Sequence, residues 1–222
     1  MKLLKFRFRY LFYSLYFNFK VLPFRQAIHL PFLCFVKPTI LKSGNVVLSC
    51  KEIKCCMIRI GQQKTPILPQ KNFIWNNEGT IVFKGKCWLG HHFMILVRDG
   101  GYLEFGDQTG INTGSRIVCA QKIIFNYKVR ASWECQFYDN DFHPVIDMIR
   151  NKPIKSRAPI ILGERVWIGH NSIISKGVKL ADGCIVSSGS VVKKRFLTPN
   201  CIIGGNPAEV QGEGYRGVLN DF

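Results

Sequence analysis

Five consecutive units of six residues run from Leu162 to Val191, and they constrain the fold of this 222-residue chain more than any other feature. The second residue is small in every unit, and the fifth is small or β-branched. The units open on the aliphatic residues Leu162, Ile168, Ile174, Leu180 and Val186. A period of six is typical of a chain that turns a corner after each unit and stacks on its own previous coil. The repeat therefore predicts an all-β core in the form of a parallel β-helix.

The same period appears upstream in a degraded form and sets the predicted boundaries. It begins near Ile81, stops at His143-Pro144 and resumes near Ile160. The intervening segment, 144–159, is polar and basic and contains proline, so we expect it to project from one corner as a loop. The predicted organisation is an N-terminal helical segment at 1–40, lead-in strands at 41–80, the β-helix at 81–211 and a tail at 212–222.

The N-terminal segment is aromatic and basic. No Asp or Glu precedes Glu52, in a chain whose formal net charge is +17. A helix over residues 3–20, ending before Pro23, would carry an apolar stripe with basic residues well off it. The stripe is Leu4, Phe8, Leu11, Phe12, Leu15 and Phe19, and the basic residues include Lys2, Arg9 and Lys20. Such a helix either packs on the body of the protein or, through residues 1–20, lies on an anionic membrane surface.

Several classes of protein are disfavoured by the sequence. Arg7 and Arg9 interrupt the place where the apolar core of a signal peptide would lie, so no signal peptide is expected. No stretch reaches about 18 uncharged apolar residues, so no transmembrane span is expected. No module that binds nucleic acid is recognisable. The nine cysteines lack regular spacing, and Cys135 and Cys184 fall on small apolar repeat positions, which fits reduced structural thiols in a cytoplasmic protein.

His143 is the leading catalytic candidate, because it stands at the foot of the long interruption of the repeat. Histidine can take a proton near neutral pH, and a nearby carboxylate or carbonyl can hold its ring in one tautomer. Asp139 and Asp141 precede it in the segment DNDFHP, and we take them as candidates for substrate binding.

Four motifs together are typical of one family of enzymes: HPVIDMIR where the interruption begins, VWIG at the start of the regular coils, SVVKK after them and GGNPAEV at the end. Over roughly residues 80–211 the chain resembles the hexapeptide-repeat acyltransferases. The nearest branch contains the maltose and galactoside O-acetyltransferases and their surface-polysaccharide relatives. The resemblance implies a left-handed parallel β-helix, a homotrimer with active sites between neighbouring subunits, acetyl-CoA as donor and a hydroxyl as acceptor. It also implies that His143 is the general base.

The resemblance further implies that CoA lies along the late coils. The matching positions are Trp167, His170, Ser188, Lys193, Lys194 and Pro207. Lysines suit phosphates as flexible point charges, although Trp167 could instead pack a corner and the lysines could form a solvated face. Glu209 departs from the family, which often has Arg or Lys there. Gly114 and Cys119 stand where the sugar acetyltransferases often carry Asn and Asp, so the acceptor need not be maltose or a galactoside.

The predicted function is CoA-dependent transfer of an acetyl group to a hydroxyl of a cell-envelope or capsule saccharide. The predicted location is the bacterial cytoplasm, with contact at the inner membrane left open. N-acylation of an amino sugar also stays open, because the same base would serve an amine. A zinc enzyme like the β-helical carbonic anhydrases is disfavoured, because the histidines form no HxxxxH pair, and no metal is expected. A non-catalytic scaffold would leave His143 and the loop without a purpose.

Overall fold

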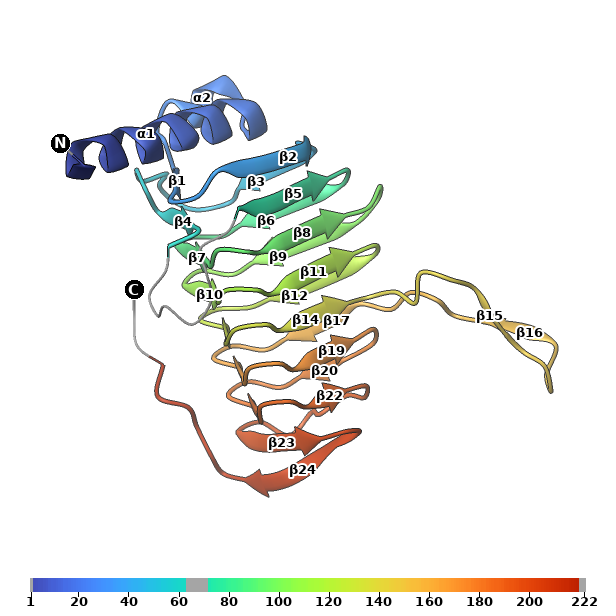
Figure 1. Cartoon of the computed structure of the whole chain (residues 1–222). Coiled ribbons are helices and arrows are strands. Elements are labelled where there is room, and N and C mark those ends of the chain that lie inside the picture. The colour runs from blue at the N-terminus through green and yellow to red at the C-terminus, as the bar shows by residue number, and fades with distance from the viewer. Residues whose placement is uncertain (1, 63–71, 220–222) are drawn as a thin grey trace.

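The computed structural model describes residues 2–62 and 72–219 and shows a long β-helical coil with helices packed at its N-terminal end (Figure 1). Three sheets form the three faces of the coil. Face A contains β1 (Phe32–Cys34), β4 (Ile58–Ile60), β7 (Cys87–Leu89), β10 (Thr109–Ile111), β13 (Arg130–Ala131), β18 (Trp167–Ile168), β21 (Ile185–Val186), β23 (Cys201–Gly205) and β24 (Ala208–Glu213).

Faces B and C complete each turn of the coil. Face B contains β2 (Pro38–Lys42), β5 (Phe73–Asn77), β8 (Met94–Val97), β11 (Arg116–Cys119), β14 (Gln136–Tyr138), β19 (Ile173–Ser175) and β22 (Val191–Val192). Face C contains β3 (Asn45–Leu48), β6 (Thr80–Phe83), β9 (Tyr102–Phe105), β12 (Lys122–Phe125), β17 (Ile160–Leu162) and β20 (Lys179–Leu180). The chain runs from face A to B to C, so the corners are called A/B, B/C and C/A below.

The strand register explains the six-residue period. Ile168 pairs with Val186, a separation of 18 residues, which equals three units of six and one complete coil. The unit-opening aliphatic residues are buried, and Val192 continues the series. The parallel β-helix predicted from the repeat is therefore confirmed.

Aromatic rings fill the earlier coils where aliphatic residues fill the later ones. The rings of Phe83, Phe105 and Phe125 stack along face C with centroids 5.0 and 5.4 Å apart. Stacked rings of this kind add to the free energy gained from burying their area. The six-residue period is weak upstream for two reasons. These coils bury aromatic residues at some inward positions and aliphatic residues at others, and longer segments connect their strands.

The coil begins earlier than the predicted boundaries. β1 already pairs with β4, and β2 pairs with β5, so the limits at residues 40 and 80 are wrong. The helical part comprises α1 (Lys2–Val21) and α2 (Phe24–Ala27). Long connections such as residues 49–57 separate the first strands, and these connections hide the period from a search for six-residue units.

Helix α1 closes the N-terminal end of the coil. Asn18 donates from Nδ2 to the carbonyl of Phe32 at 2.8 Å and accepts from its N–H at 3.1 Å. Ser14 Oγ accepts from the N–H of Cys34 at 2.9 Å, and the buried ring of Phe17 fills the end of the core. The outer edge of β1 is therefore paired by side chains, which protects it from pairing with another strand.

Two features depart from the regular coil. The segment predicted as a loop is an antiparallel arm, β15 (Val145–Asp147) and β16 (Lys152–Ile154), that projects far from the coil (Figure 1). At the other end β24 folds back antiparallel on β23, and the chain then returns along the coil (Figure 1). A Cβ added to Gly217 of this tail would lie 3.3 Å from Cε3 of Trp167, so the tail passes close to that ring.

All nine cysteines are free thiols, and Cys135 and Cys184 are buried at their repeat positions. Across residues 2–62 and 72–219, no helix combines the length and apolar character needed to cross a bilayer.

Candidate functional site

His143 lies at the B/C corner, where the chain leaves β14 to enter the arm. Its side chain is exposed, and its N–H donates to the carbonyl of Asp141 at 2.7 Å. The base of the arm is closed by a bridge between Asn140 and Arg157 and by a hydrogen bond from the N–H of Ala158 to the carbonyl of Asp139 at 3.0 Å. The arm therefore fixes the backbone on which His143 is carried.

His143 lines a solvent-open cavity of about 690 Å³. Residues from the preceding coils, including Arg98 and Asp99, line it together with Asn140 and Arg157 of the arm base. This volume lies in the range that holds small-molecule ligands. Arginine donors and carboxylate acceptors suit a ligand rich in hydroxyl groups, and His143 is the titratable imidazole among them.

Asp139 is a structural residue, so the prediction that it binds substrate is wrong. Its side chain is fully buried, with 0% exposed. Oδ1 accepts from the N–H of Ala120 at 2.7 Å, and Oδ2 accepts from the N–H groups of Gln121 and Lys122 at 2.8 and 2.7 Å. The carboxylate thus pairs three backbone donors at the corner of the preceding coil, and it cannot reach an acceptor in the cavity.

Asp141 also serves the arm. Its carboxylate pairs with the ammonium of Lys176 on the next coil, and Lys176 donates in addition to the carbonyl of Lys155 at 2.7 Å. The backbone N–H of Asp141 donates to the carbonyl of Ser156 at 2.9 Å. These contacts tie the arm to the coil; they do not direct Asp141 into the cavity.

A second group of predicted residues gathers at the A/B corner. The rings of His170 and Trp133 stack in parallel, with centroids 4.9 Å apart and planes 5° apart. Half-exposed Trp167 lies on the adjoining strand and donates from Nε1 to Oγ of Ser132 at 3.4 Å. Exposed Ser188 occupies the same corner one coil later, because the N–H of its neighbour Gly189 donates to the carbonyl of His170 at 2.8 Å.

The remaining predicted residues lie near the C-terminal end of the coil. Lys193 and Lys194 are exposed at the B/C corner, and Pro207 is exposed in the turn between β23 and β24. Lys194 pairs with Glu209 and lies 5.5 Å above the ring of Phe196. Glu209, the residue that departs from the family pattern, therefore contacts a lysine predicted to bind a CoA phosphate.

The later coils match a known family of repeats. Residues 159–194 match the family described as bacterial transferase hexapeptide (six repeats). The resemblance drawn from the sequence motifs is thereby confirmed for this region, which carries Trp167, His170, Ser188 and both lysines.

Individual relatives agree with this match. Galactoside O-acetyltransferase of Escherichia coli K12 is 35% identical over 68 residues, covering 31% of this chain and 33% of that protein. A protein of Staphylococcus aureus strain COL, named provisionally as an acetyltransferase, is 28% identical over 123 residues and covers 55% of this chain. The chain spans about one third of the first relative's length and 59% of the second's. Among solved structures, the polySia-specific acetyltransferase NeuO aligns with a TM-score of 0.49 and 19% identity over 86% of this chain and 90% of that one.

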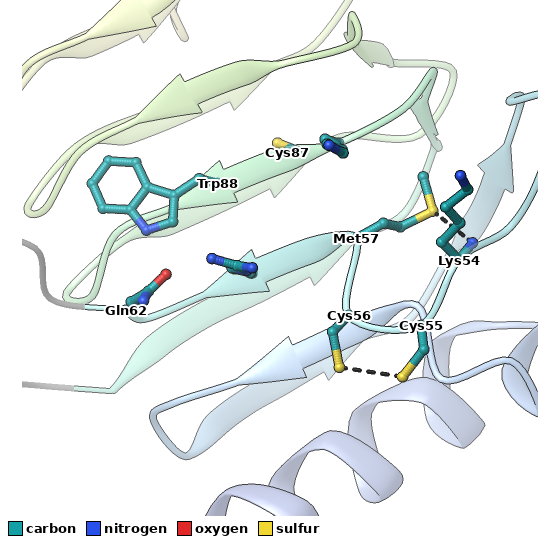
Figure 2. A pocket seen from close by; sticks show the side chains of 9 residues that line it. Lys54, Cys55, Cys56, Met57, Gln62, Cys87 and Trp88 are labelled. Carbon is teal, nitrogen blue, oxygen red and sulfur yellow. Dashed lines mark hydrogen bonds between the residues drawn. The ribbon is translucent and has the colours of Figure 1, made fainter. Parts of the chain in front are cut away.

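A smaller cavity of about 170 Å³ lies among the early coils (Figure 2). The Sγ atoms of Cys55 and Cys56 face each other at 3.3 Å, and Sδ of Met57 accepts from the N–H of Lys54 at 3.4 Å (Figure 2). Burial raises the pKa of the Cys56 thiol to about 11, and the hydrogen bond with the Cys55 thiol adds to the rise. Cys56 is therefore protonated at neutral pH and is not an activated nucleophile.

Within the described residues, no three metal-ligating side chains come together in a cluster. Sequence reasoning missed Arg98 and Arg157 in the cavity, and it missed Trp133 beneath His170. The arm creates the cavity, so nothing near Arg98 in the sequence signals its role. Trp133 stands one coil before His170 at the same corner, and a full alignment of the coils could have found it.

Proposed function

We propose that the protein is an acetyltransferase that moves an acetyl group from acetyl-CoA to a hydroxyl of a saccharide, with His143 as general base. The observation that carries the proposal is the exposed His143 at the arm base, lining a cavity of about 690 Å³ on a hexapeptide coil. A hydroxyl-bearing ligand fits the mixture of arginine, carboxylate and amide groups in that cavity.

The chemistry needs one base and close positioning. A saccharide hydroxyl is protonated at neutral pH, so neutral His143 accepts its proton as the oxygen attacks the thioester carbonyl carbon. The C–S bond then breaks, and the imidazolium returns the proton to the departing thiolate. The products are an acetyl ester and CoA with a free thiol. General-base assistance contributes about 10²–10⁴ in rate, and holding both substrates together supplies the rest without a covalent enzyme intermediate.

Of the predicted donor residues, Trp167, His170 and Ser188 lie at the A/B corner, whereas His143 stands at the B/C corner, with Lys193 and Lys194 two coils further along. A complete site would then take one corner from each of two neighbouring subunits, as in the homotrimer that the family resemblance implies. The arm supports this arrangement, because its side chains present apolar area to solvent in the isolated chain. The exposed apolar residues of the arm are Val145, Ile146, Met148, Ile149 and Ile154.

The test is acceptor-dependent release of CoA thiol from acetyl-CoA. Saccharide fractions from the cell envelope serve as acceptors, and mass spectrometry follows the gain of one acetyl group. We expect a product that mild alkali cleaves, as an ester would be. An alkali-stable amide would assign N-acylation of an amino sugar instead. Absence of both acetyl-CoA binding and thiol release would contradict the proposal.

A further inference from the structure

The outer face of helix α1 is apolar and exposed. Phe8, Phe12 and Phe19 are 66%, 68% and 47% exposed, and Leu11 and Leu15 lie between them. These residues are the apolar stripe predicted from the sequence; its remaining member, Leu4, lies outside the residues whose side chains are described, as does the predicted basic residue Lys2. Aromatic area of this size on one surface helix marks an interaction site.

The helix is held to the coil by a different face. Ser14, Phe17, Asn18 and Val21 are buried against the end of the coil, and they recur at the three- and four-residue spacing of one helix face. The exposed stripe is therefore not required to keep α1 in place. Helix α2 extends it, because Phe24 is 72% exposed and its ring centroid lies 6.0 Å from that of Phe19. Phe8, Leu11, Phe12, Leu15, Phe19 and Phe24 are called the aromatic face below.

The basic residues near the aromatic face indicate what kind of partner it binds. Arg9, Lys20 and Arg25 are exposed on the helices that carry it, and no Asp or Glu precedes Glu52 in the sequence. A second copy of the same face would bring basic side chains against basic side chains, which is unfavourable. An anionic lipid surface offers phosphate groups for the basic residues and acyl chains for the rings.

We propose that the aromatic face docks the protein on an anionic membrane surface. Helix α1 then lies in the plane of the interface, since across residues 2–62 and 72–219 no helix is suited to crossing the bilayer. The coil projects away from the membrane with the aromatic face at its lipid end. Docking does not depend on the proposed acetyl transfer, and it can be measured without any turnover.

The test is co-sedimentation with phosphatidylcholine vesicles that contain or lack phosphatidylserine. We expect the wild-type chain to bind the anionic vesicles at low salt and to be largely released at high salt, because salt screens the basic residues. The variant F8S/F12S should bind at least tenfold more weakly. The variant R9Q/K20Q/R25Q should lose roughly a hundredfold of its preference for anionic vesicles, at about fivefold per basic residue.

Matched controls carry the same changes elsewhere. Leu197→Ser removes an exposed apolar side chain near the opposite end of the coil, and Lys179→Gln removes an exposed basic one. Both should bind vesicles like wild type, and circular dichroism should show every variant folded. Equal binding by F8S/F12S and Leu197→Ser would overturn the proposal. If wild type did not bind vesicles and F8S/F12S sedimented with a lower mass than wild type, the aromatic face would instead contact a second copy of the chain. That result would also overturn the proposal.

Discussion

At the scale of single residues, Asp139 shows how a buried carboxylate can organise a corner. It receives the backbone N–H groups of Ala120, Gln121 and Lys122 at that turn. Asp139→Asn would place an amide donor against one or more of those donors. We expect the free energy of unfolding to fall by about 2–4 kcal/mol, as for a buried polar group that loses its partner. Urea unfolding measures the loss, and Asp99→Asn, an exposed carboxylate, should change it by less than about 0.5 kcal/mol.

His91 predicts a pH dependence of stability. It is fully buried, and neither ring nitrogen has a hydrogen-bond partner. Burial, with His92 as a smaller cause, lowers the pKa of His91 below its ordinary value of 6.5. The imidazole of His91 therefore binds a proton more readily in the unfolded chain than in the folded chain. Because of His91, the free energy of unfolding is highest above the pKa that this histidine has in the unfolded chain. It decreases as the pH falls below that pKa, by at most about 1.4 kcal/mol per pH unit.

Thermal or urea unfolding at pH 7.5 and pH 5.5 measures this effect as a difference between variants. His91→Leu should show less acid destabilisation than wild type, whereas His29→Gln, at an exposed histidine, should follow wild type. Identical pH profiles for wild type and His91→Leu would contradict the assignment.

Sequence reasoning located single residues where a motif was local and misread them where the partner lies on another coil. His143 and Trp167 were proposed from short motifs beside a break or at the start of a regular unit; the structure places both side chains at the surface, and their roles stay predictions. Asp139 was taken for a substrate ligand because its N–H partners at residues 120–122 lie 17–19 residues earlier in the chain. Stacking of coils brings those residues together, and linear spacing does not reveal it.

At the scale of elements, the arm is the least regular part of the coil and the part we expect to be functional. Ile149 at its tip is 98% exposed in the isolated chain. If the arm packs on a neighbouring subunit, Ile149→Asp buries a charge there and should lower acetyl transfer at least tenfold while leaving the fold intact. Leu197→Asp places the same charge on another exposed apolar position and should retain activity. Equal activity of the two variants would remove the arm from the interface.

The elements themselves could be predicted only where their packing repeats. The regular six-residue units predicted the strands of the later coils, because one aliphatic residue per face fills the same interior space in every coil. The early coils use rings such as Phe83 and Phe105 together with connections of varied length, so their period is masked and the coil start was placed too late. The helix over the first twenty residues was expected, but its apolar stripe faces away from the coil because polar Ser14 and Asn18 pair with β1.

At the scale of the whole molecule, the proposed division of the site between two corners predicts complementation between subunits. His143→Ala and Trp167→Ala subunits should each form weakly active trimers. Co-refolding them in equal amounts should restore about one quarter of wild-type activity, because one in four interfaces then joins an intact His143 to an intact Trp167. Trimers that are refolded separately and then mixed are the control and should stay weakly active. No recovery after co-refolding would place both residues in a site within one subunit.

The most direct test of the account is the turnover of His143→Ala with acetyl-CoA and a saccharide acceptor. We predict that kcat falls by about 10²–10⁴ while the affinity for acetyl-CoA changes by less than about twofold, because the base acts on the acceptor and not on the donor. His29→Ala, an exposed histidine at the N-terminal end of the protein, should keep wild-type kcat. A His143→Ala protein with kcat within a few-fold of wild type would contradict the account.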